Sequence, residues 1–536
     1  MVFPIISSRS RGFEANQDAS ALSFDRADSQ YQTMTPPTGN RRTWFFRFVG
    51  KLSVLNVLQD ILSTSGNSDS TFFDVRLLVD HRLQLGNWTT QLLVTSAAFS
   101  DPMANYDIGV AYDTTQASAP DRLGIIINGA WVSSFDTDNR ASLSPNFEGA
   151  INSAIQHAIG RQNQSGGNLL SAICSFHEMV SGYIPAVSEV GKFDGEGRWQ
   201  PKPYSGDHGV SGWLVQHTDN STIAELGKDT RPLTSGQTAN DWTPANFATT
   251  DQVSDTWSNN FCTWSGLSGT VRDGARAYDT GAGIAHEFGS QPVNGEFKFE
   301  ISIEVSSNYS RLMVGLSSEP GVDVLTSASE YFGFYASASG NQLVPGPIAY
   351  LAASANDTFM FAGNKALGYI WIGKNGTWYN SGDPEAGTNP TWTGWSGDLL
   401  FPYAGVNSSN TATWRLRSLP EDLLHTTGLE KKTLCTANLP KPASGASVAP
   451  LTGSFPGTAS ASRNFVYLGY TPDQGGVCTI NGNAITWGVH AIATANGFYT
   501  ITASPNYNSI GSNAYSIAVK YAFGGKGVAP APAQIN

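Results

Sequence analysis

The sequence predicts an all-β protein of two successive β-sandwiches followed by a small C-terminal β-sandwich domain. Its 536 residues include 56 Gly, 27 Phe and 14 Trp but only 14% charged residues, a composition typical of β-rich, turn-rich proteins. Short apolar segments alternate with clusters of turn residues over 22–135 and again from about residue 265. Residues 365–390 contain an aromatic hairpin, because Asn375-Gly376 supplies the positive φ angles of a two-residue turn between two aromatic strands.

The composition also limits the partners of this protein. A net charge of −12 argues against nucleic acid and anionic membranes, because both attract Lys/Arg-rich surfaces. No segment approaches the roughly 18 consecutive apolar residues that a membrane span needs, so membrane insertion is not expected. The N-terminus lacks the apolar stretch of a secretion signal, which predicts synthesis in a cytoplasm.

The cysteines and histidines do not form a metal-ligand pattern. Cys174, Cys262, Cys435 and Cys478 lie far apart, without Cys-x-x-Cys or a nearby Cys/His cluster, and we interpret them as mostly buried free thiols. No His-x-x-x-His or His-Glu-x-x-His spacing occurs, so the sequence predicts neither a metal site nor a cofactor.

The first domain is expected to span residues 21–264. Residues 22–135 predict an antiparallel sandwich. Residues 147–160 have the period of a helix, with Pro145 before them and Gly160 as a stop. Residues 187–264 form long aromatic-containing loops, which predicts that they pack over a sheet or bridge two domains.

The remaining domains follow from the same alternation of strands and turns. The second sandwich is expected at 265–440, with strands near 296–305, 311–317, 331–337 and 412–418 beside the aromatic hairpin. A Pro-, Ala- and Ser-rich linker at 441–452 precedes a small β-domain at 453–528 and a flexible tail at 529–536. Residues 1–20, apolar at the start and then basic, predict an attachment segment.

Several strings resemble one family. ALSFDRADSQY at 21–31, GNRRTW at 39–44, GKFDGEGRWQPK at 191–202 and NDWTPANF at 240–247 are similar to concanavalin A-like, laminin-G-like domains of tail-fibre and virion proteins of marine bacteriophages. Residues 265–425 resemble a SPRY-type domain, itself a concanavalin A-like sandwich.

The resemblance has four implications. It implies two tandem concanavalin A-like jelly-roll sandwiches, and a strand at 150–162 in place of the helix, an interpretation that we adopt. It also implies a homotrimeric virion protein, located on the tail or another surface appendage and synthesised in the host cytoplasm. The chain departs from the family at 175–179, where Ser-Phe-His-Glu-Met replaces an acidic strand ending in a loop Asp. A bound cation is therefore not expected.

The aromatic hairpin supplies the candidate binding residues. A sugar packs its apolar ring face on an aromatic plane while polar side chains bond its hydroxyls. The candidate planes are Trp371, Trp378, Tyr379 and Trp392, with Trp395 beside them, and the candidate polar groups are Lys374, Asn375, Asp383 and Asn389. The alternative is that most of these tryptophans fill the sandwich core or a subunit interface.

The most tempting catalytic pattern is Glu300-Ile301-Ser302-Ile303-Glu304. Concanavalin A-like glucanases carry Glu-x-Asp-x-Glu on one strand, with the outer carboxylates as nucleophile and general acid. Here Ser302 stands in the central position. The alternative is an amphipathic strand with Phe297, Phe299, Ile301 and Ile303 inward and Glu300 and Glu304 in solvent.

These patterns favour a bacteriophage fibre or spike protein that binds host-surface glycan without catalysis. Its expected partners are host-surface polysaccharide and other virion proteins. The first alternative is a structural virion component, such as a head fibre, decoration or tail-assembly protein, that makes protein–protein contacts. The second is a polysaccharide depolymerase that acts through Glu300 and Glu304.

Overall fold

The computed structural model describes residues 20–438 with gaps, together with four strands further along the chain. The gaps are residues 55, 103, 195–196, 267–269, 281–284, 294, 310–311, 319–330, 338–339, 347–352, 396–398, 407–409 and 426–431. Residues 1–19 of the predicted attachment segment 1–20 lie outside the described residues. The predicted linker 441–452 and tail 529–536 lie outside them entirely.

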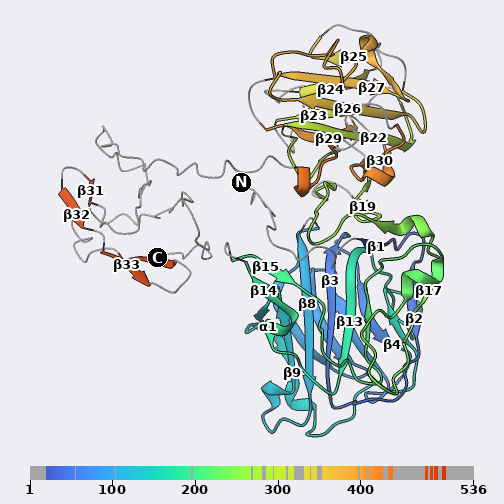
Figure 1. Cartoon of the computed structure of the whole chain (residues 1–536), viewed down its shortest axis with the longest axis vertical. Coiled ribbons are helices and arrows are strands. Elements are labelled where there is room, and N and C mark those ends of the chain that lie inside the picture. Colours follow the sequence, from blue (N-terminus) through green and yellow to red (C-terminus); the bar gives the residue numbers. More distant parts are fainter. Residues whose placement is uncertain are drawn as a thin grey trace. The chain divides into compact units, whose positions relative to one another are not determined.

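Nearly every regular element in the described residues is a β-strand (Figure 1). One four-residue α-helix occurs among them, α1 (Val187–Val190). The other helical elements are 3-10 turns: η1 (Ala119–Asp121), η2 (Arg140–Ser142), η3 (Ile223–Gly227), η4 (Thr249–Asp251), η5 (Tyr379–Ser381), η6 (Pro420–Asp422) and η7 (Thr436–Asn438). No helix in this part of the chain is long and apolar enough to cross a membrane. The predicted all-β fold class is confirmed.

The chain divides into two compact units. One comprises Met1–Gly191 and Pro201–Pro440, and the other comprises Lys192–Gln200 and Lys441–Asn536. The first unit contains two pairs of antiparallel sheets. In the second unit the described strands of the C-terminal part form two hairpins, β31 (Val477–Ile480) with β32 (Asn483–Thr486) and β33 (Gly488–Ile492) with β34 (Phe498–Thr502).

The first sandwich consists of two eight-stranded sheets in the described residues. The first sheet runs β10 (Ala130–Trp131), β9 (Leu123–Ile127), β8 (Asn105–Asp113), β3 (Thr43–Leu52), β13 (Ala172–Ser181), β1 (Ala21–Phe24), β18 (Gln252–Val253), and β16 (Trp213–Val215) also pairs with β13. The second runs β11 (Phe135–Asp138), β7 (Gln91–Ala98), β6 (Arg82–Asn87), β5 (Phe73–Leu77), β4 (Gln59–Thr64), β12 (His157–Ile159), β2 (Tyr31–Met34), β17 (Thr243–Ala245). A short pair, β14 (Gly191–Phe193) with β15 (Trp199–Pro201), is separate from both sheets.

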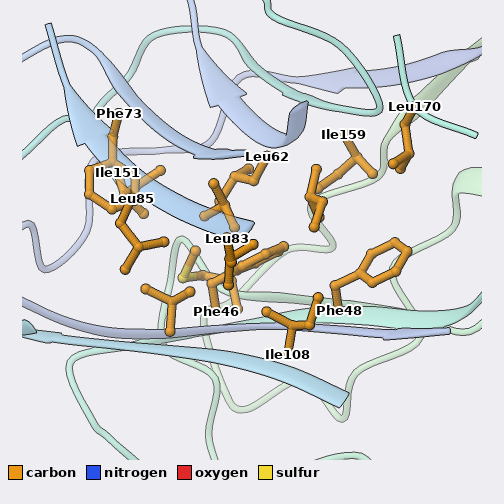
Figure 2. Close-up of a cluster of buried hydrophobic side chains, with 14 of the residues drawn as sticks. Phe46, Phe48, Leu62, Phe73, Leu83, Leu85, Ile108, Ile151, Ile159 and Leu170 are labelled. Atoms are coloured by element: carbon orange, nitrogen blue, oxygen red, sulfur yellow. The ribbon is translucent and has the colours of Figure 1, made fainter. Parts of the chain in front are cut away.

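One hydrophobic core fills the space between these two sheets. Alternation along β3 directs Phe46 and Phe48 to this core, where they face Leu83 and Leu85 of β6 (Figure 2). All four side chains are buried. Burying one such side chain contributes roughly 1.5–3 kcal/mol, so the alternating pattern of the sequence is sufficient to bring these sheets together.

Residues 147–160 do not form the helix that their period predicts. Instead, β12 lies between β2 and β4 and pairs antiparallel with both. The buried side chains of Ile151 and Ile159 join the sandwich core, and that core can be reached equally well by a strand. Pairing with two neighbouring strands therefore overrides a weak helical preference. The strand implied by the family resemblance is confirmed for His157–Ile159.

The long loops that follow β13 cover the outer face of the first sheet. Leu214 of β16 packs on Val49 and Phe176 of that outer face. Strands β16 and β18 pair with β13 and β1 of the same sheet, and β17 pairs with β2 of the second sheet. The expectation that these loops pack over a sheet is confirmed. This cover explains why β3 is buried on both of its faces.

A fully buried arginine lies under this cover. Arg47 donates from Nε and Nη2 to Asp107 (2.7 and 2.6 Å) and from Nη1 to Glu178 (2.9 Å). Its guanidinium also donates to the carbonyl oxygens of Val190 and Lys202, both at 2.7 Å. A buried charge is costly unless it is paired and hydrogen-bonded. The two carboxylates and two carbonyls meet this requirement and attach the loop to the sheet.

The second sandwich consists of a seven-stranded and a five-stranded sheet in the described residues. The larger runs β19 (Thr270–Arg272), β20 (Ala277–Asp279), β30 (Ala412–Arg417), β22 (Glu296–Ser306), β26 (Thr358–Asn364), β27 (Tyr369–Lys374), β28 (Thr377–Trp378). The smaller runs β21 (Ala285–Phe288), β29 (Phe401–Val406), β23 (Leu312–Ser317), β24 (Tyr331–Ser337), β25 (Gly340–Val344). The inward positions predicted for β22 are confirmed, because Phe297, Phe299, Ile301 and Ile303 are all buried in the core.

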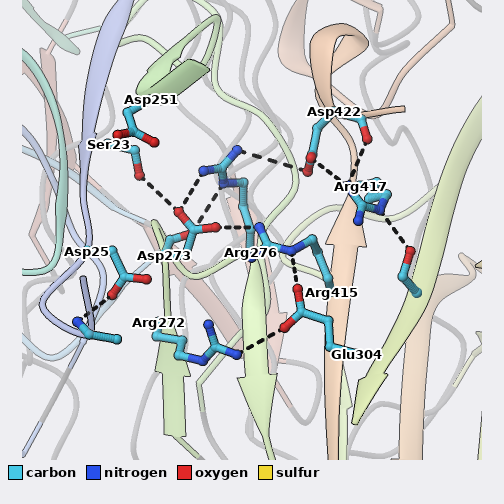
Figure 3. A network of polar contacts seen from close by, with 12 residues as sticks. Ser23, Asp25, Asp251, Arg272, Asp273, Arg276, Glu304, Arg415, Arg417 and Asp422 are labelled. Atoms are coloured by element: carbon cyan, nitrogen blue, oxygen red, sulfur yellow. Dashed lines mark hydrogen bonds and ion pairs between the residues drawn. The ribbon is translucent and has the colours of Figure 1, made fainter. Parts of the chain in front are cut away.

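A chain of ion pairs crosses the larger sheet (Figure 3). Asp273 accepts from Arg276 (2.7 Å), from Arg415 and from Ser23 Oγ (3.3 Å). Arg415 in turn pairs with Glu304 of β22. Burial alone would raise the pKa of Asp273, but the charges of Arg276 and Arg415 outweigh it and hold that pKa well below its usual range.

Three buried histidines lie among tryptophans in the first sandwich. His177 accepts a hydrogen bond at Nδ1 from the indole of Trp213 (3.1 Å) and lies 5.8 Å from the ring of His217. Trp242 packs edge-on against His177, and His157 lies edge-on to Trp213. Burial lowers the pKa of His157 and of His217 to about 4, and that of His177 well below its usual value.

We therefore expect the first sandwich to lose stability in acid. The unfolded chain binds protons at all three histidines below about pH 6.5, whereas the folded chain keeps His157 and His217 neutral down to about pH 4, and the pKa of His177 is also lowered. The free energy of unfolding should fall as the pH falls through this window, by on the order of 2–3 kcal/mol for each of His157 and His217, and His177 adds to the fall. Urea unfolding at pH 7.5 and 4.5 measures the fall.

A His157→Gln variant separates this contribution from others. Burial raises the pKa of Asp74 to about 7, which acts in the opposite direction because the folded state then binds the proton more tightly. The loss of unfolding free energy caused by the substitution itself is measured at pH 7.5. Between pH 7.5 and pH 4.5 the unfolding free energy of the variant should then fall by less than that of the wild type. An equal fall in both proteins would contradict the prediction.

Candidate functional site

The aromatic hairpin forms one edge of the larger sheet of the second sandwich. Lys374 of β27 pairs with Thr377 of β28 across a two-residue turn in which Asn375 and Gly376 have φ of 49° and 84°. The turn predicted from Asn-Gly is therefore confirmed. The Asn375 side chain fixes it further, because Oδ1 accepts from the backbone N–H of Thr358 (2.8 Å) in the neighbouring strand β26.

Three of the tryptophans expected to be exposed are instead buried, and one of them, Trp395, lies in the sandwich core. Trp371 is fully buried, and its indole N–H donates to the carbonyl of Thr388 at 2.8 Å. Trp392 is buried and donates in the same way to the carbonyl of Pro345 at 2.9 Å. The expectation that they offer surface planes is wrong. Alternation on β27 sends Ile370 and Ile372 to the core and leaves Trp371 on the opposite face, where residues 379–389 cover it.

The loop after β28 is closed on itself. Asp383 and Thr388 exchange two backbone hydrogen bonds of 3.0 Å each. The Asp383 carboxylate accepts at Oδ1 from the backbone N–H groups of Glu385 and Ala386, both at 3.0 Å. Asn389 donates from Nδ2 to the carbonyl of Ser381 (3.2 Å), so its side chain stabilises the loop.

A hollow opens between this loop and the hairpin. It has a volume of about 480 Å³ and is lined by Gly376, Thr377, Trp378, Ser381, Gly382, Asp383 and Pro384. The structure thus brings together two of the eight predicted residues, Trp378 and Asp383. Thr377 and Ser381 were missed, although their positions beside Trp378 in the same turn-rich segment could have pointed to them. Their hydroxyls are exposed and have no hydrogen-bond partner in the described part of the chain.

Glycines shape the two walls of the hollow. Gly373 lies opposite Trp378 in the ladder, and a Cβ there would lie 3.0 Å from Trp378 Cε3 and 2.4 Å from Met360 Cε. Gly382 passes over Trp371 so closely that a Cβ would lie 2.7 Å from its Cδ1. The indole of Trp378 can therefore lie against its neighbouring strand, half-buried, while the loop lies tightly on the sheet.

The remaining predicted polar residues support the turn and do not line the hollow. Lys374 Nζ lies 2.6 Å from Asp357 Oδ2, and both side chains are largely buried. The amide of Asn375 donates to the other oxygen of Asp357 at 2.7 Å. Tyr379 is half-buried and packs against the sandwich core. Asp357, also missed in the sequence, is the group that fixes this turn.

Glu300 and Glu304 are engaged in structural contacts. Glu300 is fully buried, contrary to the expectation that it faces solvent, and it accepts from the backbone N–H groups of Leu424 (2.8 Å) and His425 (3.0 Å). Burial raises its pKa although these bonds act against the shift. Glu304 pairs with Arg272 and Arg415. Neither carboxylate lines the hollow.

The Glu300 contact also positions one further side chain. Lys298, beside it on β22 and fully buried, donates to the carbonyl of His425. The two buried charges hold this segment so that the imidazole lies against the turn: a Cβ on Gly376 would lie 3.2 Å from His425 Nδ1.

Metal-binding and thiol chemistry find little support in the described residues. No group of three or more His, Cys, Asp or Glu side chains is placed to hold a metal ion in this part of the chain. Cys174 and Cys262 are buried, and burial raises the pKa of both thiols. The arrangement at the hollow consists of an aromatic face, two hydroxyls and one fixed carboxylate, which is suited to binding a polyhydroxylated ligand.

No protein family model matches this chain, and no curated protein matches it either. Similar solved structures include the SPRY domain of human HERC1, with 16% identity over 26% of this chain and 87% of that chain and a TM-score of 0.21. Domains LG4-5 of the mouse laminin α1 chain match at 12% identity over 77% of this chain and 92% of that chain, with a TM-score of 0.26. The CBM40 of the Ruminococcus gnavus IT-sialidase, bound to α2,3-sialyllactose, matches at 10% identity over 34% and 96%, with a TM-score of 0.22.

These three structures share a concanavalin A-like jelly-roll fold. With identities of 10–16% and TM-scores of 0.21–0.26, these likenesses do not indicate what this chain binds.

A methyl group on Gly373 should displace Trp378. We expect Gly373→Ala to shift the emission of the Trp378 indole and to destabilise the second sandwich by roughly 1–3 kcal/mol, because the added carbon overlaps Met360 and the indole. Fluorescence and urea unfolding check this. Gly167→Ala, whose added carbon would meet its nearest neighbour at 3.5 Å, should change neither. Equal effects of both substitutions would contradict the packing argument.

The Trp371 indole should hold the loop in place. We expect Trp371→Phe, which keeps an aromatic ring but removes the N–H donor to Thr388, to cost about 1–2 kcal/mol and to speed amide exchange over 379–389. Trp414→Phe is a matched control, because the buried Trp414 N–H has no partner in the described part of the chain. Amide exchange over 379–389 that is faster than wild type in Trp414→Phe, or unchanged in Trp371→Phe, would contradict the role of the Trp371 indole in holding the loop.

Proposed function

We propose that this protein binds glycan at the hollow between the β27–β28 hairpin and the 379–389 loop, without catalysis. One observation carries the proposal: the hollow combines the half-buried indole of Trp378 with the fixed carboxylate of Asp383 and the unpartnered hydroxyls of Thr377 and Ser381. The apolar face of a sugar ring packs on the indole, and the polar groups bond its hydroxyls. The engagement of Glu300 and Glu304 in structural contacts supports binding without hydrolysis.

We extend the proposal to the biological setting. The protein would be a fibre or spike on a bacteriophage particle, made in the host cytoplasm, and the glycan would belong to the host surface. Support for the phage setting comes from the sequence resemblance at 21–44 and 191–247. A trimeric state and contacts with other virion proteins rest on the same resemblance.

A second function is favoured by a separate observation. Trp131 and Trp88 of the first sandwich leave 55% and 44% of their surface exposed. Large exposed apolar side chains are typical of protein–protein contacts. A structural virion component would use such side chains and would not retain polysaccharide.

Retention of polysaccharide tests the proposed function. The full chain is passed over a panel of immobilised bacterial surface polysaccharides, with released oligosaccharide measured in the same assay. We expect saturable retention without release, and at least a tenfold loss of affinity in Trp378→Ala, because the aromatic plane supplies most of the contact. Trp88→Ala is the matched control and should bind as the wild type does.

The other outcomes point elsewhere. Retention that is lost in Trp88→Ala and kept in Trp378→Ala would exclude the hollow as the binding site. Release of oligosaccharide would contradict binding without catalysis. No retention on any polysaccharide would favour the structural virion component.

A further inference from the structure

We propose that the hollow at Trp378 selects uncharged sugars and rejects acidic ones such as uronic acids. The inference rests on the proposed function and deepens it, because it names the chemical class of glycan that this site accepts. It follows from three features: the orientation of the Asp383 carboxylate, the negative charge of the nearby Glu385, and the ion pair that neutralises Lys374 of the hairpin.

The Asp383 carboxylate is pre-oriented at the hollow. Its Oδ1 accepts two backbone hydrogen bonds from the next turn, and its Oδ2 has no partner in the described residues. A carboxylate only accepts hydrogen bonds. A sugar hydroxyl can donate to Oδ2, whereas a sugar carboxylate cannot donate and repels it.

The charge beside Asp383 has the same sign. Glu385, two residues further on, is exposed and adds a second negative group to the loop. The cation of the hairpin, Lys374, lies 2.6 Å from Asp357 in a largely buried pair, so its charge is neutralised within the frame. The hollow therefore presents negative charge without a compensating cation on its hairpin, in a chain whose net charge is −12.

An acidic sugar seated on Trp378 would meet this charge at close range. Like charges brought together at an interface cost binding free energy and so exclude wrong partners. A neutral sugar keeps the stacking contact and gains a charge-assisted hydrogen bond to Asp383. We expect the neutral form of a given glycan to bind at least tenfold more tightly at low salt, with the difference shrinking as salt is added.

Matched polysaccharides test the inference. Alginate, hyaluronan and polygalacturonate are each compared with their carboxyl-reduced forms, which keep the linkages and lose the charge. The full chain is assayed at pH 8, where an unperturbed imidazole is uncharged. Retention of reduced forms and at least tenfold weaker retention of the native forms is the expected result.

One substitution assigns the effect to the site. Asp383→Asn keeps the acceptor for the two backbone N–H groups and removes the charge, so it should narrow the difference between native and reduced forms at least threefold. Asp121→Asn removes one exposed charge from the first sandwich and should leave that difference unchanged.

The outcomes separate the inference from the proposed function. Equal or tighter binding of the native acidic forms, lost in Trp378→Ala, would overturn the selectivity while the glycan site remains. The same difference in Asp383→Asn as in the wild type would also overturn it. Retention of no form by a correctly folded chain would refute the glycan site itself, and the selectivity with it.

Discussion

The larger sheet of the second sandwich depends on the ion pairs around Asp273. This carboxylate lies at the turn between β19 and β20 and pairs with the guanidinium groups of Arg276 and Arg415 (Figure 3). Arg415 also pairs with Glu304 of β22. The ladder β19-β20-β30-β22 is thereby cross-linked by charge on one face and by core packing on the other. The neighbouring strands β26, β27 and β28 extend this rigid sheet and carry the hollow at its edge. A binding loop on a rigid scaffold can hold its ligand groups in fixed positions.

Two kinds of tryptophan build the hollow, and their roles are complementary. Trp371 uses its N–H to fasten the loop to the sheet, and its ring fills the space beneath Gly382. Trp378, seven residues on, lies across the turn and keeps one face toward the hollow. Loops that carry function tend to be loosely attached, because water competes for their backbone groups. Here a buried indole and a closed backbone loop remove much of that freedom, so a ligand would bind a preformed surface.

Buried charged side chains in this protein hold neighbouring segments in place through hydrogen bonds to their backbone groups. Arg47 attaches the covering loop of the first sandwich, and Lys298 and Glu300 attach the segment that contains Leu424 and His425. Arg47 donates to the carbonyl oxygens of Val190 and Lys202 as well as to its two carboxylates, and Glu300 accepts from the backbone N–H groups of Leu424 and His425. Such groups would be costly to leave unpaired, which explains why charges occur in interiors that are otherwise apolar.

The sequence by itself determined the fold class and the local geometry of the hairpin. Alternation fixed which side chains of β22 face the core, because side chains of a strand point to opposite faces, and Asn375-Gly376 fixed the turn, because few residues adopt positive φ. The tertiary structure decided which aromatic rings reach the surface. Trp371 and Trp378 look alike in sequence, but the 379–389 loop covers Trp371 and leaves Trp378 half-buried at the hollow.

The same distinction applies to the charged residues. Glu300 looked like a solvent-facing position on an amphipathic strand, yet a segment more than 120 residues further along covers it. Lys374 looked available for a ligand until the fold placed Asp357 beside it. Local pattern specifies the period, the turn and the core face, whereas burial, charge pairing and the shape of a site depend on which distant segments come to lie over them.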